Sequence, residues 1–143
     1  MTGPDIIVGE SPIQRLLGFV VDISDKGGSA RCFLDIRDDH INRNGVVHGG
    51  IITTLLDCAG GFTAGLATDG DGSVPCLTIS LNVQFMAPAI SGRVTASAKR
   101  RGGGRKLHFL DMQLTDENGR VLATAQGVFK PASRPTPDER PTQ

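Results

Sequence analysis

The sequence predicts an α+β domain in which about six antiparallel strands curve around one long central helix. Between residues 48 and 66, apolar side chains recur at steps of three and four, which is the spacing of one helix face. Residues 77–85 alternate strictly between apolar and polar side chains, the pattern of a strand with one buried face. One apolar helix among such strands can bury its stripe by lying against the sheet that they form.

The remaining elements are predicted in chain order. Residues 11–17 should form a short helix, with Ser11 as the N-cap and Pro12 in the first turn. The other strands are expected at residues 19–24, 30–36, 93–101, 106–115 and 120–130. We therefore divide the 143-residue chain into a flexible N-terminus (1–10), one folded domain (11–130) and a proline-rich, charged tail expected to be disordered (131–143).

Composition and charge narrow the class of protein. Apolar residues make up 38% of the chain and charged residues 21%, as in ordinary globular domains. Fifteen basic residues balance fifteen acidic ones, whereas nucleic-acid binders usually carry a basic excess. No apolar run is long enough to span a membrane, no signal peptide is evident, and the three cysteines are widely separated. We expect a cytoplasmic protein that binds neither nucleic acid nor a membrane and keeps its thiols reduced.

The most informative stretch runs from Asn42 to Asp57. Residues 42–50 read Asn-Arg-Asn-Gly-Val-Val-His-Gly-Gly, and Asp57 follows His48 by nine residues. In these residues the chain resembles the hotdog-fold acyl-CoA thioesterases of the phenylacetic-acid-degradation type. In that family a loop asparagine leads to His-Gly-Gly at the start of the central helix, and an aspartate follows. The resemblance covers roughly residues 15–130 and implies a hotdog fold that hydrolyses an acyl-CoA thioester.

The resemblance assigns a role to each catalytic residue. Asp57 is the general base for water or a direct nucleophile, and the Gly49 N–H stabilises the oxyanion. A helix N-terminus suits the second role because its first amides are free and carry a partial positive charge. The side chains of Asn42, His48 and Thr78 position the reactants; for His48 the alternative is that it only caps the helix and holds its loop. The reaction that the resemblance implies needs no metal or other cofactor, and coenzyme A is part of the substrate.

A second candidate site is the basic segment over residues 99–106, Lys-Arg-Arg-Gly-Gly-Gly-Arg-Lys. A glycine-rich backbone can form an anion-binding concavity, and coenzyme A carries phosphates. We expect phosphate contact through Arg101 or Arg105; the alternative is a hairpin whose charges serve only solubility. The substrate-binding set is completed by Gly50, Ser80 and Gly102.

Helix geometry indicates that one chain cannot complete the catalytic site. A helix rises about 1.5 Å per residue, so Gly49 and Asp57 lie about 12 Å apart. Both must lie within roughly 3 Å of one reacting carbonyl. Two antiparallel helices of a homodimer would bring Asp57 to the partner subunit's Gly49, with the small residues Thr53, Gly60 and Gly61 allowing the approach. We expect an obligate homodimer, with a homotetramer as the larger assembly.

Two other functions stay open at this stage. One is a hotdog-fold hydratase or dehydratase that acts on acyl thioesters, although the longer histidine-and-carboxylate pattern of those enzymes is not evident. The other is a non-catalytic acyl-CoA-binding protein. His40 and His108 are interpreted as structural residues on the surface or in strands. The acyl group is open among aryl-acetyl, medium-chain and broad preferences.

Overall fold

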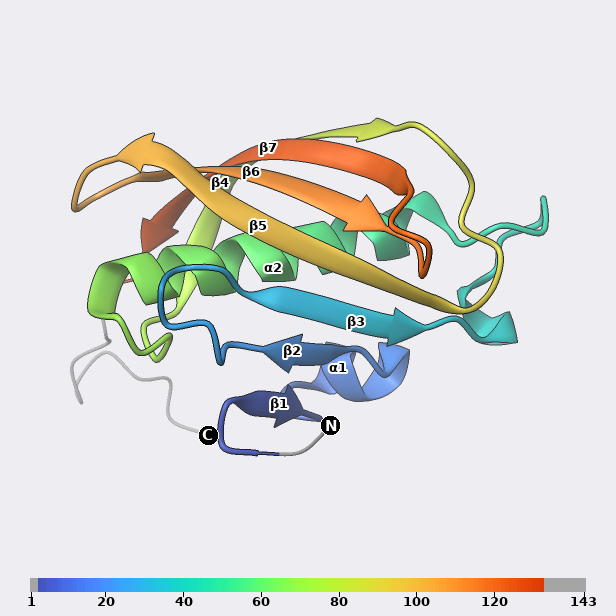
Figure 1. Cartoon of the computed structure of the whole chain (residues 1–143), viewed down its shortest axis with the longest axis horizontal. Helices are drawn as coiled ribbons and strands as arrows, with labels where there is room; N and C mark the ends of the chain where they lie inside the picture. Colours follow the sequence, from blue (N-terminus) through green and yellow to red (C-terminus); the bar gives the residue numbers. More distant parts are fainter. Residues whose placement is uncertain (1–2, 133–143) are drawn as a thin grey trace, which may run out of the picture.

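The computed structural model describes residues 3–132 and consists of a seven-stranded antiparallel sheet curved around one long helix (Figure 1). The sheet order is β1-β2-β3-β5-β6-β7-β4, so β1 and β4 form its edges. This confirms the architecture expected from the sequence. The elements are β1 (Ile6–Val8), α1 (Pro12–Leu17), β2 (Val20–Asp22), β3 (Arg31–Asp35), η1 (Asp38–His40), α2 (Gly49–Asp69), β4 (Cys76–Phe85), β5 (Arg93–Gly103), β6 (His108–Thr115) and β7 (Val121–Pro131).

The N-terminal segment differs from the sequence-based prediction. The chain forms β1 within residues 1–10, which were expected to be flexible, and pairs it with β2, with Ile7 opposite Val21. A strand of three residues is too short to show a period-two pattern, which is why it was missed. The predicted α1 is confirmed, with Ser11 Oγ accepting the N–H of Gln14 at 3.3 Å. Most of the tail expected to be disordered, from residue 133 on, lies outside the described residues.

The long helix α2 fills the concave side of the sheet. It packs against strands β3 to β7, and the side chains of Leu55 and Leu56 are fully buried there. By length and composition alone α2 could cross a membrane, so the expectation that no apolar run is that long is wrong. The nine α2 residues buried inside this domain account for its apolar character.

Glycines let α2 approach its sheet and the α2–β4 loop closely. A Cβ atom on Gly60 would lie 2.6 Å from both Met112 Sδ and the Phe129 ring, and one on Gly65 would lie 2.9 Å from the Val74 carbonyl oxygen. The expectation that Gly60 faces a partner helix is therefore wrong, because this residue is buried against β6 and β7. The pattern of glycines indicated close packing, but it could not say against which element.

A β-bulge in β4 changes which of its side chains face α2. Thr78 pairs with Phe129 of β7, and Ser80 pairs with the next residue back, Val128, so Ile79 is an extra residue. A bulge shifts the alternation of side chains by one position. Thr78 consequently shares the helix-facing side with Leu81, which packs against the core. The strict alternation predicted through residues 77–85 is broken at this point.

Candidate active site

Asp57 of α2 and Thr78 of the edge strand β4 are in contact on the concave face of the sheet. The Thr78 hydroxyl donates a hydrogen bond of 2.6 Å to Asp57 Oδ1. The bulge at Ile79 directs this hydroxyl toward α2, because unbroken alternation would place Thr78 on the face opposite Leu81. Within residues 3–132 no donor contacts Asp57 Oδ2, so one carboxylate oxygen is held and the other is available to a water molecule or a carbonyl carbon.

The Asp57–Thr78 pair opens on a pocket of ≈ 470 Å³. Its walls come from α2 (Cys58, Gly61 and Phe62), from the α2–β4 loop and from Glu10 near the N-terminus. The lining is more apolar than polar, which suits the hydrocarbon part of an acyl group. The sequence did not predict Glu10 as a pocket residue, because it belongs to the segment that was expected to be flexible.

Cys58, the neighbour of Asp57, is not a rival nucleophile. Burial, followed by the nearby charge of Asp57, raises the pKa of its thiol to about 12. A thiolate is the reactive form of cysteine, and at neutral pH this side chain stays protonated. In the described part of the chain, no three His, Cys, Asp or Glu side chains are grouped to hold a metal ion.

The N-terminus of α2 offers one available amide. His48 is the N-cap, and its Nδ1 accepts the Gly50 N–H at 2.8 Å. Gly50 is thus occupied, whereas the Gly49 N–H has no acceptor within residues 3–132. The Phe85 ring lies beside Gly49, since an added Cβ would be 3.3 Å from two ring carbons. Phe85 was missed by the sequence analysis, which assigned it only to the strand.

The loop before α2 is held by the other predicted residues. Asn42 Oδ1 accepts the N–H groups of Asn44 at 2.9 Å and Val46 at 3.3 Å, so this oxygen stabilises the loop turn. The His48 N–H donates to the His40 carbonyl oxygen at 2.9 Å. His40 is structural, as expected, but only 1% exposed rather than on the surface. Asn42 and His48 therefore lie with Gly49 at the helix N-terminus and not beside Asp57.

Comparison with known proteins identifies the family. The family model described as "Thioesterase superfamily" matches residues 44–123, more than half of the chain. The chain belongs to the thioesterase superfamily. The predicted enzyme class, a thioester hydrolase, is confirmed, and so is the resemblance on which it rested.

Individual relatives agree with the family assignment. Human acyl-coenzyme A thioesterase 13 is 29% identical over 114 residues, covering 77% of this chain and 78% of the human protein. A phenylacetic acid degradation-related protein from Ralstonia eutropha is similar in structure, with 28% identity, a TM-score of 0.71, and coverage of 85% of this chain and 93% of its own. The PaaI protein of the E. coli phenylacetic acid degradation operon shares the fold, with a TM-score of 0.72 at 19% identity over 87% of this chain and 86% of its own.

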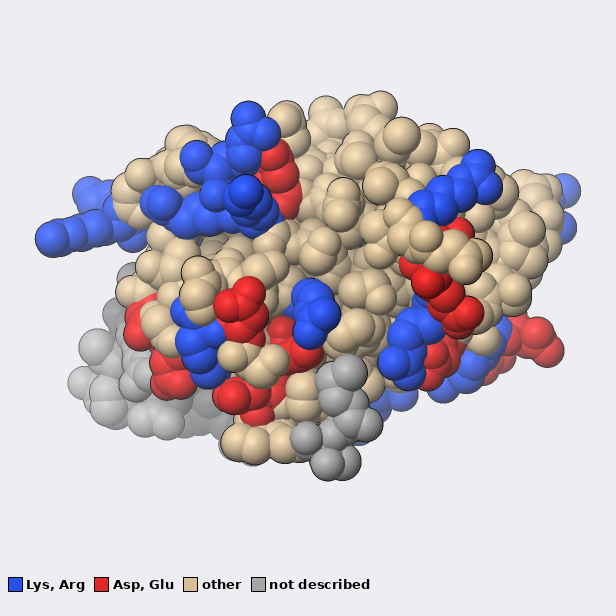
Figure 2. Space-filling model, in the orientation of Figure 1, with Lys and Arg blue, Asp and Glu red and all other residues tan. Residues whose placement is uncertain are grey.

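The basic segment over residues 99–106 forms the end of β5 and most of the turn that leads into β6 (Figure 2). Arg101 is the extra residue of a second bulge, between Arg100 and Gly102, and its Nη1 pairs with Asp111 Oδ2 at 2.5 Å. It lines a hollow of ≈ 570 Å³ with Ser80 on the outer face of the sheet. The structure thus brings Ser80 and Arg101 together, but on the side of the sheet away from Asp57.

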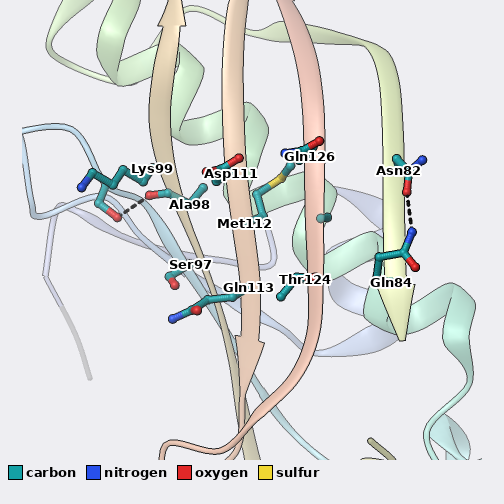
Figure 3. A pocket seen from close by; sticks show the side chains of 12 residues that line it. Asn82, Gln84, Ser97, Ala98, Lys99, Asp111, Met112, Gln113, Thr124 and Gln126 are labelled. Carbon is teal, nitrogen blue, oxygen red and sulfur yellow. Dashed lines mark hydrogen bonds between the residues drawn. The ribbon is translucent and has the colours of Figure 1, made fainter. Parts of the chain in front are cut away.

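Another hollow also lies on the outer face and holds none of the predicted catalytic residues (Figure 3). It measures ≈ 820 Å³, and its lining is rich in polar side chains from four strands, among them Asn82, Gln84, Lys99, Gln113 and Gln126. The concave and convex faces of the sheet therefore differ in chemistry. In the described part of the chain, the concave face is where the Asp57 carboxylate, the Thr78 hydroxyl and a mainly apolar pocket lie together.

Proposed function

We propose that this protein hydrolyses an acyl-CoA to a free carboxylic acid and coenzyme A, at two identical sites that are each shared between two copies of the chain. The observation that carries the proposal is the 2.6 Å contact between Thr78 and Asp57 beside an apolar pocket. The membership in the thioesterase superfamily and the similarity to human acyl-coenzyme A thioesterase 13 support the choice of substrate.

The chemistry follows from the placement of these groups. Asp57 takes a proton from water while the water oxygen bonds to the thioester carbonyl carbon, or the Asp57 carboxylate attacks this carbon itself and water later hydrolyses the acyl-aspartyl anhydride that results. On either route the carbonyl oxygen becomes negatively charged. The N–H of the partner subunit's Gly49 donates to this oxygen. Collapse of the tetrahedral intermediate breaks the C–S bond, and the thiolate of coenzyme A leaves and is protonated. One such oxyanion donor typically contributes about 2.7–4 kcal/mol to the transition state.

The exposed edge strand β4 supports the shared site. β4 is an edge strand of the sheet, and three of its large apolar side chains are more than half exposed: Leu77 (57%), Ile79 (56%) and Phe85 (57%). An apolar edge with unpaired backbone groups is usually covered in the assembled protein. A second copy lying antiparallel along β4 would cover it and would set the two α2 helices side by side. Pairing of two such dimers through the polar outer face would give the expected tetramer.

A thiol-release assay over a panel of acyl-CoAs tests the reaction. We expect Asp57→Asn to lower kcat by about 10²–10⁴-fold, the usual contribution of a general base. Asp39→Asn, which makes the same chemical change at an exposed position in η1, should leave kcat unchanged. Full activity of Asp57→Asn would contradict the proposed mechanism. Binding of acyl-CoA without turnover by the wild type would favour a binding protein, and hydration of an alkene substrate would favour a hydratase.

A further inference from the structure

A chain of hydrogen bonds runs from α2 to the guanidinium group of Arg100. His108 of β6 is 3% exposed, and its Nδ1 accepts the Arg100 Nε–H at 2.9 Å. On the other side of the ring, Nε2 lies 2.9 Å from Thr68 Oγ1, and the Thr68 hydroxyl donates to the Ala64 carbonyl oxygen at 2.8 Å. Because an arginine can only donate, Nδ1 must accept and carries no proton. The Thr68 hydroxyl donates its proton to Ala64, so it can only accept from Nε2, and the ring is therefore the tautomer protonated on Nε2.

His108 therefore acts as a fixed acceptor for Arg100. Burial, together with the positive charge of Arg100, lowers the pKa of His108, so the ring is neutral at physiological pH. A neutral ring can accept from the guanidinium group, whereas a protonated one would repel it. The long and otherwise mobile arginine side chain is thus held in one orientation before any ligand binds, which reduces the entropy lost on binding.

Arg100 lines a pocket that has the properties of an anion site. The pocket measures ≈ 480 Å³, and Ala67, Thr68, Gly104, Arg105 and His108 complete its lining, which contains no carboxylate. Arg100 pairs with the buried residue Leu110, so its side chain lies on the helix-facing side of the sheet, unlike Arg101. In the described part of the chain, Arg100 Nη1 and Nη2 have no acceptor. Two free donors on a fixed planar group match the oxygens of a phosphate.

We propose that this pocket binds a phosphate group through Arg100 and Arg105, with His108 as a positioning residue. The phosphate is one of those on the coenzyme A part of the substrate, and to that extent the proposal rests on the proposed function. Thr68 follows Asp57 by eleven residues, or three helical turns, so the two lie on the same side of α2 about 16 Å apart. That separation is comparable with the extended pantetheine arm that links a thioester to the phosphates.

The test compares an acyl-CoA with the matching S-acyl-pantetheine, which lacks the phosphates. We expect Arg100→Gln to raise KM for the acyl-CoA by about ten-fold or more, as for loss of a charged hydrogen bond, and to leave KM for the acyl-pantetheine unchanged. Arg120→Gln, an exposed arginine on the β6–β7 hairpin, is the matched control and should change neither. His108→Gln should give a smaller loss with the same selectivity for the phosphate-bearing substrate.

A second measurement, titration of pyrophosphate by calorimetry, separates two sources of phosphate. Weaker pyrophosphate binding by Arg100→Gln with no change in KM would show that the pocket serves a separate phosphate ligand. If Arg100→Gln changes neither KM nor pyrophosphate binding, the proposed site is wrong. It is also wrong if Arg101→Gln, and not Arg100→Gln, weakens binding of the phosphate-bearing substrate. If the wild type cleaves neither thioester, the proposed function fails, and the pyrophosphate titration still decides whether the pocket binds phosphate.

Discussion

At the scale of single residues, one hydroxyl determines how the Asp57 carboxylate is presented. The 2.6 Å distance from Thr78 is that of a hydrogen bond to a charged acceptor, which is shorter and stronger than one between neutral groups. The bond holds Oδ1, and within the described residues Oδ2 has no donor, so it is the oxygen that the proposed mechanism uses. Because Thr78 belongs to β4 and Asp57 to α2, the same bond also fixes the helix against the strand.

Removing this hydroxyl should weaken catalysis without unfolding the protein. Thr78→Val keeps the shape of the side chain, and we expect kcat to fall by about 10–100-fold, since a hydrogen bond to a charged group contributes about 1.5–3 kcal/mol. Thr78→Ser keeps the donor and should retain most of the activity. Steady-state kinetics and melting temperatures of the two variants provide the measurement. Equal kcat values for Val and Ser at this position would show that the hydroxyl has no catalytic role.

At the scale of elements, the sequence predicted which segments form strands better than which way their side chains point. Alternation across residues 77–85 correctly indicated β4, but taken literally it put Thr78 and Leu81 on opposite faces. Ile79 fits the alternation as well as its neighbours do, so nothing in the composition of the strand indicates a bulge. The family resemblance assigned Thr78 its role, and the bulge explains how that role is compatible with the strand.

The candidate site was predictable to the extent that it depends on local sequence. Helical periodicity predicted the helix that carries Gly49 and Asp57, and the family resemblance singled out these two residues; the structure begins that helix after the N-cap His48. What periodicity could not give was contact between distant segments. Glu10 reaches the Asp57 pocket, and Arg100 meets His108, only because the sheet curves around the helix. Such contacts depend on tertiary packing, which a pattern within one segment does not specify.

The α2–β4 loop, which forms one wall of the pocket, is held by the carboxylate of Asp69. One oxygen accepts the N–H groups of Asp71 and Gly72, and the other accepts the Ser73 hydroxyl and the Val74 N–H. Partial burial opposes ionisation, but these bonds outweigh it and lower the pKa of Asp69 to about 2. The folded loop therefore favours the charged form of this side chain.

This shift predicts how acid affects stability. The folded pKa of Asp69 lies below its ordinary value, so the unfolded chain binds the proton more readily between about pH 4 and pH 2. The contribution of Asp69 is complete above that window and is lost as the pH falls through it. We expect Asp69→Asn to lower the free energy of unfolding by about 1 kcal/mol at neutral pH, and by less at about pH 2.5.

Urea unfolding at the two pH values measures this difference. Other carboxylates also titrate in the same range, so the relevant quantity is the gap between wild type and variant and not the absolute stability. Asp39→Asn, which changes an exposed aspartate outside the loop, should show no gap that depends on pH. A gap for Asp69→Asn of the same size at both pH values would mean that its charge is not what stabilises the loop.

At the scale of the whole molecule, the two groups of the proposed catalytic site lie on the same helix and cannot meet within one chain. Gly49 and Asp57 are eight residues apart, or about 12 Å. Bending α2 enough to join them would break its packing against five strands. The second copy that we propose would supply the missing group, and the apolar edge of β4 offers a surface for it. Gly61, partly exposed beside Asp57, remains on a side of α2 that such a copy can approach.

Mixing two inactive variants tests this arrangement directly. Asp57→Asn removes the base, and Gly49→Pro removes the oxyanion donor while keeping the helix, because proline is well tolerated at the first helical position. The backbone of His48, at φ −58° and ψ 133°, also suits a residue that precedes proline. Gly49→Ala, which retains the N–H, shows how much of any loss comes from contact with the Phe85 ring. Each variant alone should form dimers with little activity.

In a mixed dimer, one site combines both substitutions and the other has neither. Random exchange of subunits makes half of the dimers mixed, so we expect activity to recover to about one quarter of the wild-type value. Dimer exchange is followed by light scattering and native mass spectrometry. If each site were built within one chain, every site in the mixture would carry one of the two defects and no activity would return. Recovery therefore depends on α2 of one subunit supplying the carboxylate and α2 of the other supplying the amide.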